Sequence, residues 1–277
     1  MNSRLEAREI LRRIGTQPDE DIDLAEGALA LGALARPDQP LERYRRHLAA
    51  LARDVADRFD ADTDCLEARI TLLHEVIIER YGYTGDTDTY DDLQNANLLR
   101  VIDRRKGLPV ALGILYLHAA RSMGWNMTGL NFPGHFLVRL DVGGERAILD
   151  PFNAGQVRTA VDLRDLLKAT AGTAAELEPG HYQPVGNRDI LLRLQNNLKL
   201  RYLSSNDVTQ ALDTLETMRL MAPEEPTLWR ETGLLEAHSG NLEQAITALE
   251  KFMRLGGTDH QLHQAAMLIQ QFKNRLH

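Results

Sequence analysis

Residues 104–155 decide the fold, and they read RRKGLPVALGILYLHAARSMGWNMTGLNFPGHFLVRLDVGGERAILDPFNAG. The first part of this stretch predicts a buried helix from Pro109 to Met123. Apolar residues recur there at helical spacing, proline suits a first helical position, and Gly124 suits the stop. The sequence therefore predicts that Pro109 begins a buried helix.

The second part of the stretch has the pattern of a β-hairpin. From His135 to Leu140 the residues alternate between two faces of a strand, Gly143-Gly144 turns the chain, and a second strand ends at Asp150. The sequence therefore predicts that His135 and Asp150 lie on adjacent antiparallel strands, within hydrogen-bond reach of each other. A carboxylate in that position orients an imidazole as a general base.

On these residues the chain resembles the transglutaminase-like superfamily. In outline, that core has Gly-x-Cys at a helix start, a glycine ending the helix, a histidine opening a strand and Asp-Pro ending the next strand. The matching residues here are Gly107-Leu108-Pro109, Gly124, His135 and Asp150-Pro151. The likeness is closer to the SirB-type bacterial proteins, and the phrases that carry it are RRKGLPVALGILYLHAA, GLNFPGHFLVRL, ILDPFNAG and LQNNLKLRYL. The resemblance implies an α+β fold with a transglutaminase-like (papain-like) core, followed by all-α tetratricopeptide-like helix pairs.

The position that matches the catalytic cysteine is Pro109, which has no nucleophilic atom. No serine or threonine occurs from Gly107 to Leu117, and the hydroxyl of Tyr116 lies nearly two helical turns beyond Pro109. Pro109, His135 and Asp150 therefore form a degenerate triad. Singly, His135 and Asp150 also suit structural roles, but together they indicate descent from a catalytic core.

Cys65 is the single cysteine of the chain. It precedes a stretch with helical periodicity, and a helix N-terminus would lower the pKa of its thiol. No base motif surrounds Cys65, and it lies upstream of the core helix, unlike the family pattern. An inert thiol is the favoured interpretation.

Composition restricts the partners of the protein. With 32 Lys and Arg against 40 Asp and Glu, the net charge is -8, which disfavours nucleic acid as a ligand. No apolar run reaches the length of a membrane span, and the sequence MNSRLEAREILRRIG has no signal-peptide pattern. These features predict a cytoplasmic protein without a membrane partner.

Three segments are expected. We expect residues 1–60 to form helices that pack on the core and residues 61–187 to form the transglutaminase-like core. Residues 188–277 are expected to form tetratricopeptide-like repeats. The repeat assignment follows from Ala211 and Ala245, which are 34 residues apart in two similar segments, the tetratricopeptide period. Such repeats favour a protein or peptide partner, although they also serve to complete a fold.

Metal and cofactor sites are not predicted. The Asp-rich loop 84–92 lacks the ligand spacing and closing glutamate of a calcium loop, and a solvated turn that caps a helix from Leu93 explains the same residues. His260 and His263 share one helical face, but no third ligand follows at a recognisable spacing.

Two functions remain open from the sequence. The favoured one is a noncatalytic transglutaminase-like protein that binds a peptide or protein partner in the degenerate groove, through Asn131, Phe132, His135 and Asp150, and through the repeats. The alternative is an unusual hydrolase or transferase in which His135, oriented by Asp150, activates water or a substrate hydroxyl. The absence of a nucleophile at Pro109 favours the first.

Overall fold

The computed structural model describes residues 3–276. They form two compact units, the first made of residues up to Ile10 together with Pro18–Leu194, and the second of Leu11–Gln17 together with Gln195 onward. Helices α1 (Ser3–Ile14) and α8 (Asn187–Ser204) each contribute residues to both units. The sequence thus continues from one unit to the other without a loop at the second boundary.

Helices make up the first half of the first unit. They are η1 (Asp19–Asp21), α2 (Leu24–Leu34), α3 (Leu41–Ala56), η2 (Ala61–Thr63), α4 (Leu66–His74), the π-helical η3 (Glu75–Arg80), η4 (Leu93–Ala96), α5 (Leu98–Arg104) and α6 (Pro109–Ser122). The predicted core helix is confirmed, since α6 begins with Pro109 at its first turn. Every residue from Pro109 to Leu117 is buried, as expected for a helix that is apolar on all sides.

A five-stranded antiparallel sheet follows α6. Its strands are β3 (Asn126–Leu130), β4 (Val138–Val142), β5 (Glu145–Asp150), β6 (Gln156–Val157) and β7 (Pro184–Val185), in the order β6-β5-β4-β3-β7. β1 (Thr84–Gly85) and β2 (Lys106–Gly107) form a separate parallel pair. Gly143 and Gly144 both have positive φ, 58° and 91°, and make the predicted two-residue turn between β4 and β5. The α+β fold class is confirmed.

The expectation that His135 opens a strand is wrong by three residues. β4 begins at Val138, and His135 lies in the connection from β3. The cause is local: Pro133 has no backbone N–H to donate to a ladder, and Gly134 has a φ of +68°, which takes the chain out of extended geometry. Asp150 is, as predicted, the last residue of β5.

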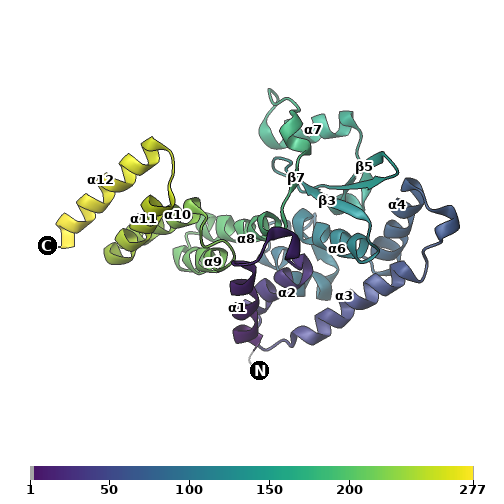
Figure 1. Cartoon of the computed structure of the whole chain (residues 1–277), viewed down its shortest axis with the longest axis horizontal. Coiled ribbons are helices and arrows are strands. Elements are labelled where there is room, and N and C mark those ends of the chain that lie inside the picture. The colour runs from purple at the N-terminus through teal and green to yellow at the C-terminus, as the bar shows by residue number, and fades with distance from the viewer. Residues whose placement is uncertain (1–2, 277) are drawn as a thin grey trace. The chain divides into compact units, whose positions relative to one another are not determined.

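Helices cover both faces of the sheet (Figure 1). On the α6 side, Phe136 packs so closely on Gly113 that a Cβ there would lie 2.4 Å from the ring. On the other side, α7 (Ala160–Ala171) buries Leu163 and Leu167 against Leu130 and Leu137. The first unit is completed by η5 (Pro151–Asn153) and η6 (Pro179–Tyr182).

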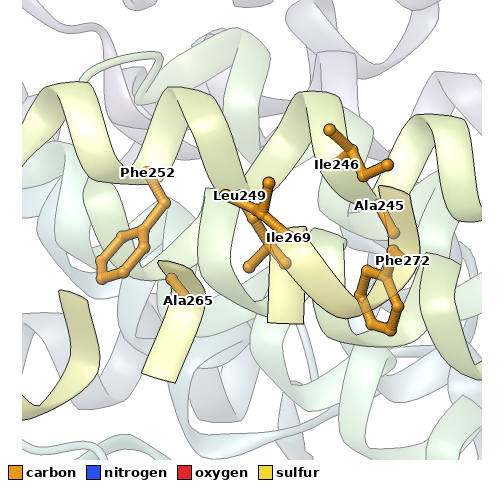
Figure 2. Close-up of a cluster of buried hydrophobic side chains, with 7 residues drawn as sticks. All are labelled: Ala245, Ile246, Leu249, Phe252, Ala265, Ile269 and Phe272. Atoms are coloured by element: carbon orange, nitrogen blue, oxygen red, sulfur yellow. The ribbon is translucent and has the colours of Figure 1, made fainter. Parts of the chain in front are cut away.

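The second unit contains the predicted helix pairs, with α9 (Val208–Met221), α10 (Pro226–His238), α11 (Leu242–Leu255) and α12 (Asp259–Leu276) after the end of α8. Ala211 and Ala245 are fully buried in α9 and α11, where a small side chain lets neighbouring helices approach. Figure 2 shows how α11 packs on α12 through Ala245, Ile246, Leu249, Phe252, Ala265, Ile269 and Phe272. Among residues 3–276, no helix combines the length and apolarity needed to cross a membrane.

Candidate functional site

His135 and Asp150 are hydrogen-bonded, as the sequence predicts. The imidazole Nε2 lies 2.8 Å from the carboxylate Oδ1. The antiparallel register of β4 and β5, with Val138 paired to Leu149, brings the connection before β4, which carries His135, beside the end of β5. Asp150 is fully buried and caps η5, since its Oδ1 also accepts from the backbone N–H of Phe152 at 3.1 Å.

The second oxygen of Asp150 is also occupied. Oδ2 accepts from Nε and Nη2 of Arg158, at 3.1 and 2.8 Å, and from Nδ2 of Asn153 at 2.8 Å. Burial alone would raise the pKa of Asp150, but the hydrogen bonds from His135, Asn153 and Arg158 outweigh it and lower the pKa to about 2. The carboxylate is therefore ionised at neutral pH and has no oxygen left for a ligand.

The hydrogen bond to Asp150 engages one of the two ring nitrogens of His135. The other nitrogen, Nδ1, has no hydrogen-bond partner among residues 3–276. It is not fully shielded from solvent, unlike Tyr116 Oη and Thr128 Oγ1, which are shielded and also lack a partner. Because a carboxylate only accepts, Nε2 donates in this hydrogen bond, so Nδ1 is the acceptor whenever the ring carries a single proton. Phe152 packs at a right angle to the ring, with centroids 6.1 Å apart. His135 itself is buried, with 9% of its surface exposed, and its ring is held by Asp150 and Phe152.

The position that matches the catalytic cysteine holds a proline. Pro109 is buried at the start of α6, and α6 packs against η5, directly after Asp150. The hydroxyl of Tyr116, on the same helix, is buried and has no hydrogen-bond partner. It lies so close to Gly155 that a Cβ atom added to this glycine would be 2.3 Å from the hydroxyl oxygen. Burial, and then the charge of Asp150, raise the pKa of Tyr116, so its hydroxyl stays protonated and is a poor nucleophile.

The other residues singled out from the sequence lie in different surroundings. Asn131 is exposed, and its backbone N–H donates to Gln183 O at 3.0 Å. Phe132 is only 1% exposed and packs in the cluster beneath α7, so its ring supports the loop of His135 from inside the fold. Cys65 is exposed at the N-cap of α4, where its Sγ accepts from Ala68 N at 3.4 Å. It lines a cavity of about 500 Å³ whose lining includes no histidine.

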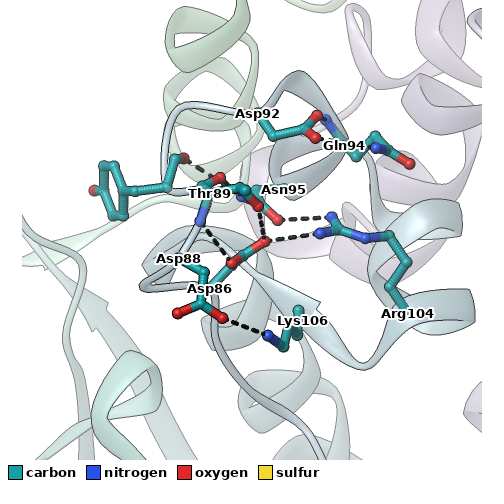
Figure 3. A network of polar contacts seen from close by, with 9 residues as sticks. Asp86, Asp88, Thr89, Asp92, Gln94, Asn95, Arg104 and Lys106 are labelled. Atoms are coloured by element: carbon teal, nitrogen blue, oxygen red, sulfur yellow. Dashed lines mark hydrogen bonds and ion pairs between the residues drawn. The ribbon is translucent and has the colours of Figure 1, made fainter.

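The Asp-rich loop is mostly exposed, as expected of a solvated turn, but one of its carboxylates, that of Asp86, is buried in a polar network (Figure 3). Asp86 is 1% exposed, forms an ion pair of 2.7 Å with Arg104, and accepts from the hydroxyl of Thr89 at 2.7 Å. Its burial acts to raise the pKa, but the hydrogen bonds from Thr89 and Arg104 lower it well below the usual range. The sequence prediction was wrong for Asp86, because its cation lies 18 residues downstream; the expected helix cap is confirmed at Asp92, which accepts from Gln94 N at 2.9 Å.

Residues 3–276 contain no group of three or more His, Cys, Asp or Glu placed to hold a metal ion. His260 and His263 both lie on α12, where Nε2 of His260 is 3.4 Å from Nε2 of Gln264. Arg158 and Arg104, which secure the two buried aspartates, were not identified from the sequence. The signal that would have found Arg158 is the short return strand β6, which brings it back beside Asp150.

Fold and site together define a transglutaminase-like domain, with its histidine and aspartate in place, followed by helical repeats. The family described as transglutaminase-like superfamily matches residues 42–196, and that of the tetratricopeptide repeat matches residues 198–270. The chain therefore belongs to the SirB-type family of transglutaminase-like proteins.

The relatives extend over most of the chain. A UPF0162 protein of Vibrio cholerae is 34% identical over 78% of this chain and 81% of its own length. A UPF0162 protein of Xylella fastidiosa is 27% identical over 89% of each chain. The protein SirB1 of Salmonella typhimurium is 25% identical over 83% of this chain and 85% of its own. No solved structure matches the chain.

Proposed function

We propose that the protein is a noncatalytic transglutaminase-like module that binds a peptide or protein partner through the surface at His135 and through its repeats. The observation that carries this proposal is the combination of an imidazole held by Asp150 at 2.8 Å with a proline at the nucleophile position. A fixed Nδ1 acceptor recognises a backbone or side-chain amide N–H without any covalent step. Asp150 positions the imidazole, and the exposed Asn131 supplies further polar contacts nearby in the chain.

The repeats supply the second part of the proposed surface. Leu234 and Met267 are 37% and 63% exposed, and both line a cavity of about 380 Å³ in the second unit, together with Arg230. Exposed apolar side chains around a cavity favour an apolar segment of a partner. Met253 is 39% exposed but does not line this cavity, which makes it a matched control.

The test is capture from native bacterial extract on the immobilised full chain, with bound proteins quantified by mass spectrometry. We expect a defined set of partners to be lost with His135→Ala or Met267→Glu and retained with the exposed controls His260→Ala and Met253→Glu. Circular dichroism at increasing temperature establishes that all four variants are folded. Retention of every partner by both test variants would contradict the proposal.

A direct readout ties the binding to the imidazole. In the chain labelled with ¹⁵N-histidine, addition of a captured partner, or of a peptide from it, should shift the Nδ1 resonance of His135 and leave His260 unchanged. A partner that binds without moving Nδ1 would place the binding surface elsewhere.

The second candidate is a hydrolase or transferase that uses His135 as a general base. The geometry of His135 and Asp150 favours it, because a buried carboxylate orients the ring for proton abstraction. Arg158 opposes it, since a second cation on the same carboxylate weakens the support that Asp150 gives to an imidazolium. Turnover of an amide or ester substrate that disappears with His135→Ala would establish this alternative.

A further inference from the structure

Three consecutive cations at the end of α5 have three different surroundings. Arg104 pairs with Asp86 at 2.7 Å, and Lys106 with Asp88 at 3.1 Å. Arg105 lies between them in the left-handed region, with a φ of 62°, so its side chain leaves in another direction. Its Nη1 contacts His47 Nε2 at 2.8 Å and Tyr83 Oη at 2.5 Å. Among residues 3–276, Arg105 has no carboxylate within ion-pair distance.

Arg105 lines a surface cavity of about 430 Å³ with Arg43, Arg46, His47 and Asp103. Asp103 is the one carboxylate of this lining, and it already accepts from Arg36 at 2.6 Å, from Arg43 at 3.1 Å and from the hydroxyl of Tyr44 at 3.1 Å. Three arginines against one aspartate leave two positive charges in the cavity, on a chain whose net charge is -8. The local field is therefore opposite in sign to that of the whole protein.

His47 adds a neutral donor to this cavity. Because Arg105 donates to Nε2, the proton of the neutral ring lies on Nδ1. Nδ1 has no hydrogen-bond partner among residues 3–276 and is not fully shielded from solvent. Burial, and then the charges of Arg105 and Arg43, lower the pKa of His47 to about 4, with Asp103 acting in the opposite direction. The hydroxyl groups of Tyr81 and Tyr83, whose rings pack on His47, have raised pKa values and stay neutral. An anion in the cavity would thus meet an N–H donor and several guanidinium groups.

We propose that the cavity formed by Arg43, Arg46, His47 and Arg105 binds the phosphate group of a phosphate monoester. A monoester carries about −1.5 to −2 charges at neutral pH and has three strong acceptor oxygens, which match two unbalanced positive charges and a set of guanidinium donors. A carboxylate carries a single negative charge and would leave one of the two positive charges of the cavity unbalanced. Planar guanidinium groups are the side chains best suited to such an oxyanion. This site is separate from His135 and does not depend on the proposed function.

The test follows His47 by NMR in the full chain, labelled with ¹⁵N-histidine, at constant ionic strength. Inorganic phosphate, O-phosphoserine and acetate are titrated separately to about 10 mM, which covers Kd values up to the millimolar range. We expect phosphate and phosphoserine to bind and to raise the pKa of His47 by at least about one unit, because a bound dianion favours the imidazolium. If phosphoserine binds more tightly than inorganic phosphate, the site is assigned to a phosphorylated side chain. If the two bind equally, the site is assigned to free phosphate. No change at His47 with either ligand, or an equal change with acetate, would overturn the proposal.

Variants locate the site. Arg105→Gln should weaken phosphate binding by about tenfold or more, as expected for loss of a charged hydrogen-bond donor, whereas Arg146→Gln, an exposed arginine on β5, should leave it unchanged. Arg46→Gln changes an exposed side chain of the cavity, and a loss of about threefold is expected even if Arg105→Gln does not fold. Equal affinity in Arg46→Gln, Arg146→Gln and the unchanged chain would refute the assignment.

Discussion

Replacing Asp150 by Asn tests whether the buried carboxylate holds the site together. The pKa of Asp150 falls from its usual 3.8 to about 2 in the folded protein. At about 1.4 kcal/mol per pH unit, this corresponds to about 2 kcal/mol of folding free energy at neutral pH. An asparagine cannot accept at both positions, so either the contact with Arg158 or those with the backbone N–H groups are lost as well. We expect Asp150→Asn to lower the free energy of unfolding by about 3 kcal/mol at pH 7.

The pH dependence gives the sharper result. A lowered pKa stabilises the folded state above the pKa of the unfolded chain, and this stabilisation disappears as the pH falls through the folded pKa. For Asp150 the window lies between about pH 4 and pH 2. Because an asparagine does not titrate, the difference between the two proteins should shrink by about 2 kcal/mol across this window.

The assay is urea unfolding followed by the fluorescence of Trp125, which is 5% exposed before β3, in a Trp229→Phe background that removes the second tryptophan of the chain. Asp141→Asn is the matched control. Asp141 lies on β4, pairs with Arg139 at 2.9 Å and remains accessible to solvent, so its loss should cost less than about 1 kcal/mol. A cost of Asp150→Asn no larger than this control, or a difference that stays constant from pH 4 to pH 2, would refute the reasoning.

Three further predictions concern chemistry and packing. The purified protein should show no transamidation or thiol-protease activity, and alkylating Cys65 should change no function, because Pro109 cannot form an acyl-enzyme; amide turnover sensitive to iodoacetamide would contradict this. Gly113→Ala should lower the free energy of unfolding by about 1–3 kcal/mol, because the added Cβ would lie 2.4 Å from the buried ring of Phe136; urea unfolding with unchanged stability would contradict it. Ala245→Leu should cost a similar amount in the second unit, since its side chain is fully buried, and calorimetry would detect this as a lowered Tm.

The elements with a strong local signal were predictable from the sequence. Pro109 followed by an apolar helical run predicted the start of α6, and the glycine pair at Gly143 predicted the turn that brings Asp150 back to the loop of His135. The separation of Ala211 and Ala245 predicted the repeats. Each of these signals lies within one helix, one hairpin or one repeat period.

Contacts between distant segments could not be predicted in the same way. Asp86 belongs to a stretch whose composition is typical of an exposed loop, and only the parallel pairing of β1 with β2 places Arg104 beside it. The contact of His47 with Arg105 joins residues 58 positions apart and depends on the left-handed conformation of Arg105. Nothing in the local pattern of either residue indicates the other.

Helix α8 limits how freely the modules of this protein can be separated. Arg193, on α8, donates to the carbonyl oxygens of Phe132 at 2.8 Å and His135 at 2.5 Å, and so holds the loop that carries the imidazole. The same helix continues to Ser204, past the boundary of the first unit at Leu194. A chimaera that joins this core to other repeats must therefore keep α8 from its own sequence, because a junction placed before Arg193 would release the His135 loop together with the part that was exchanged.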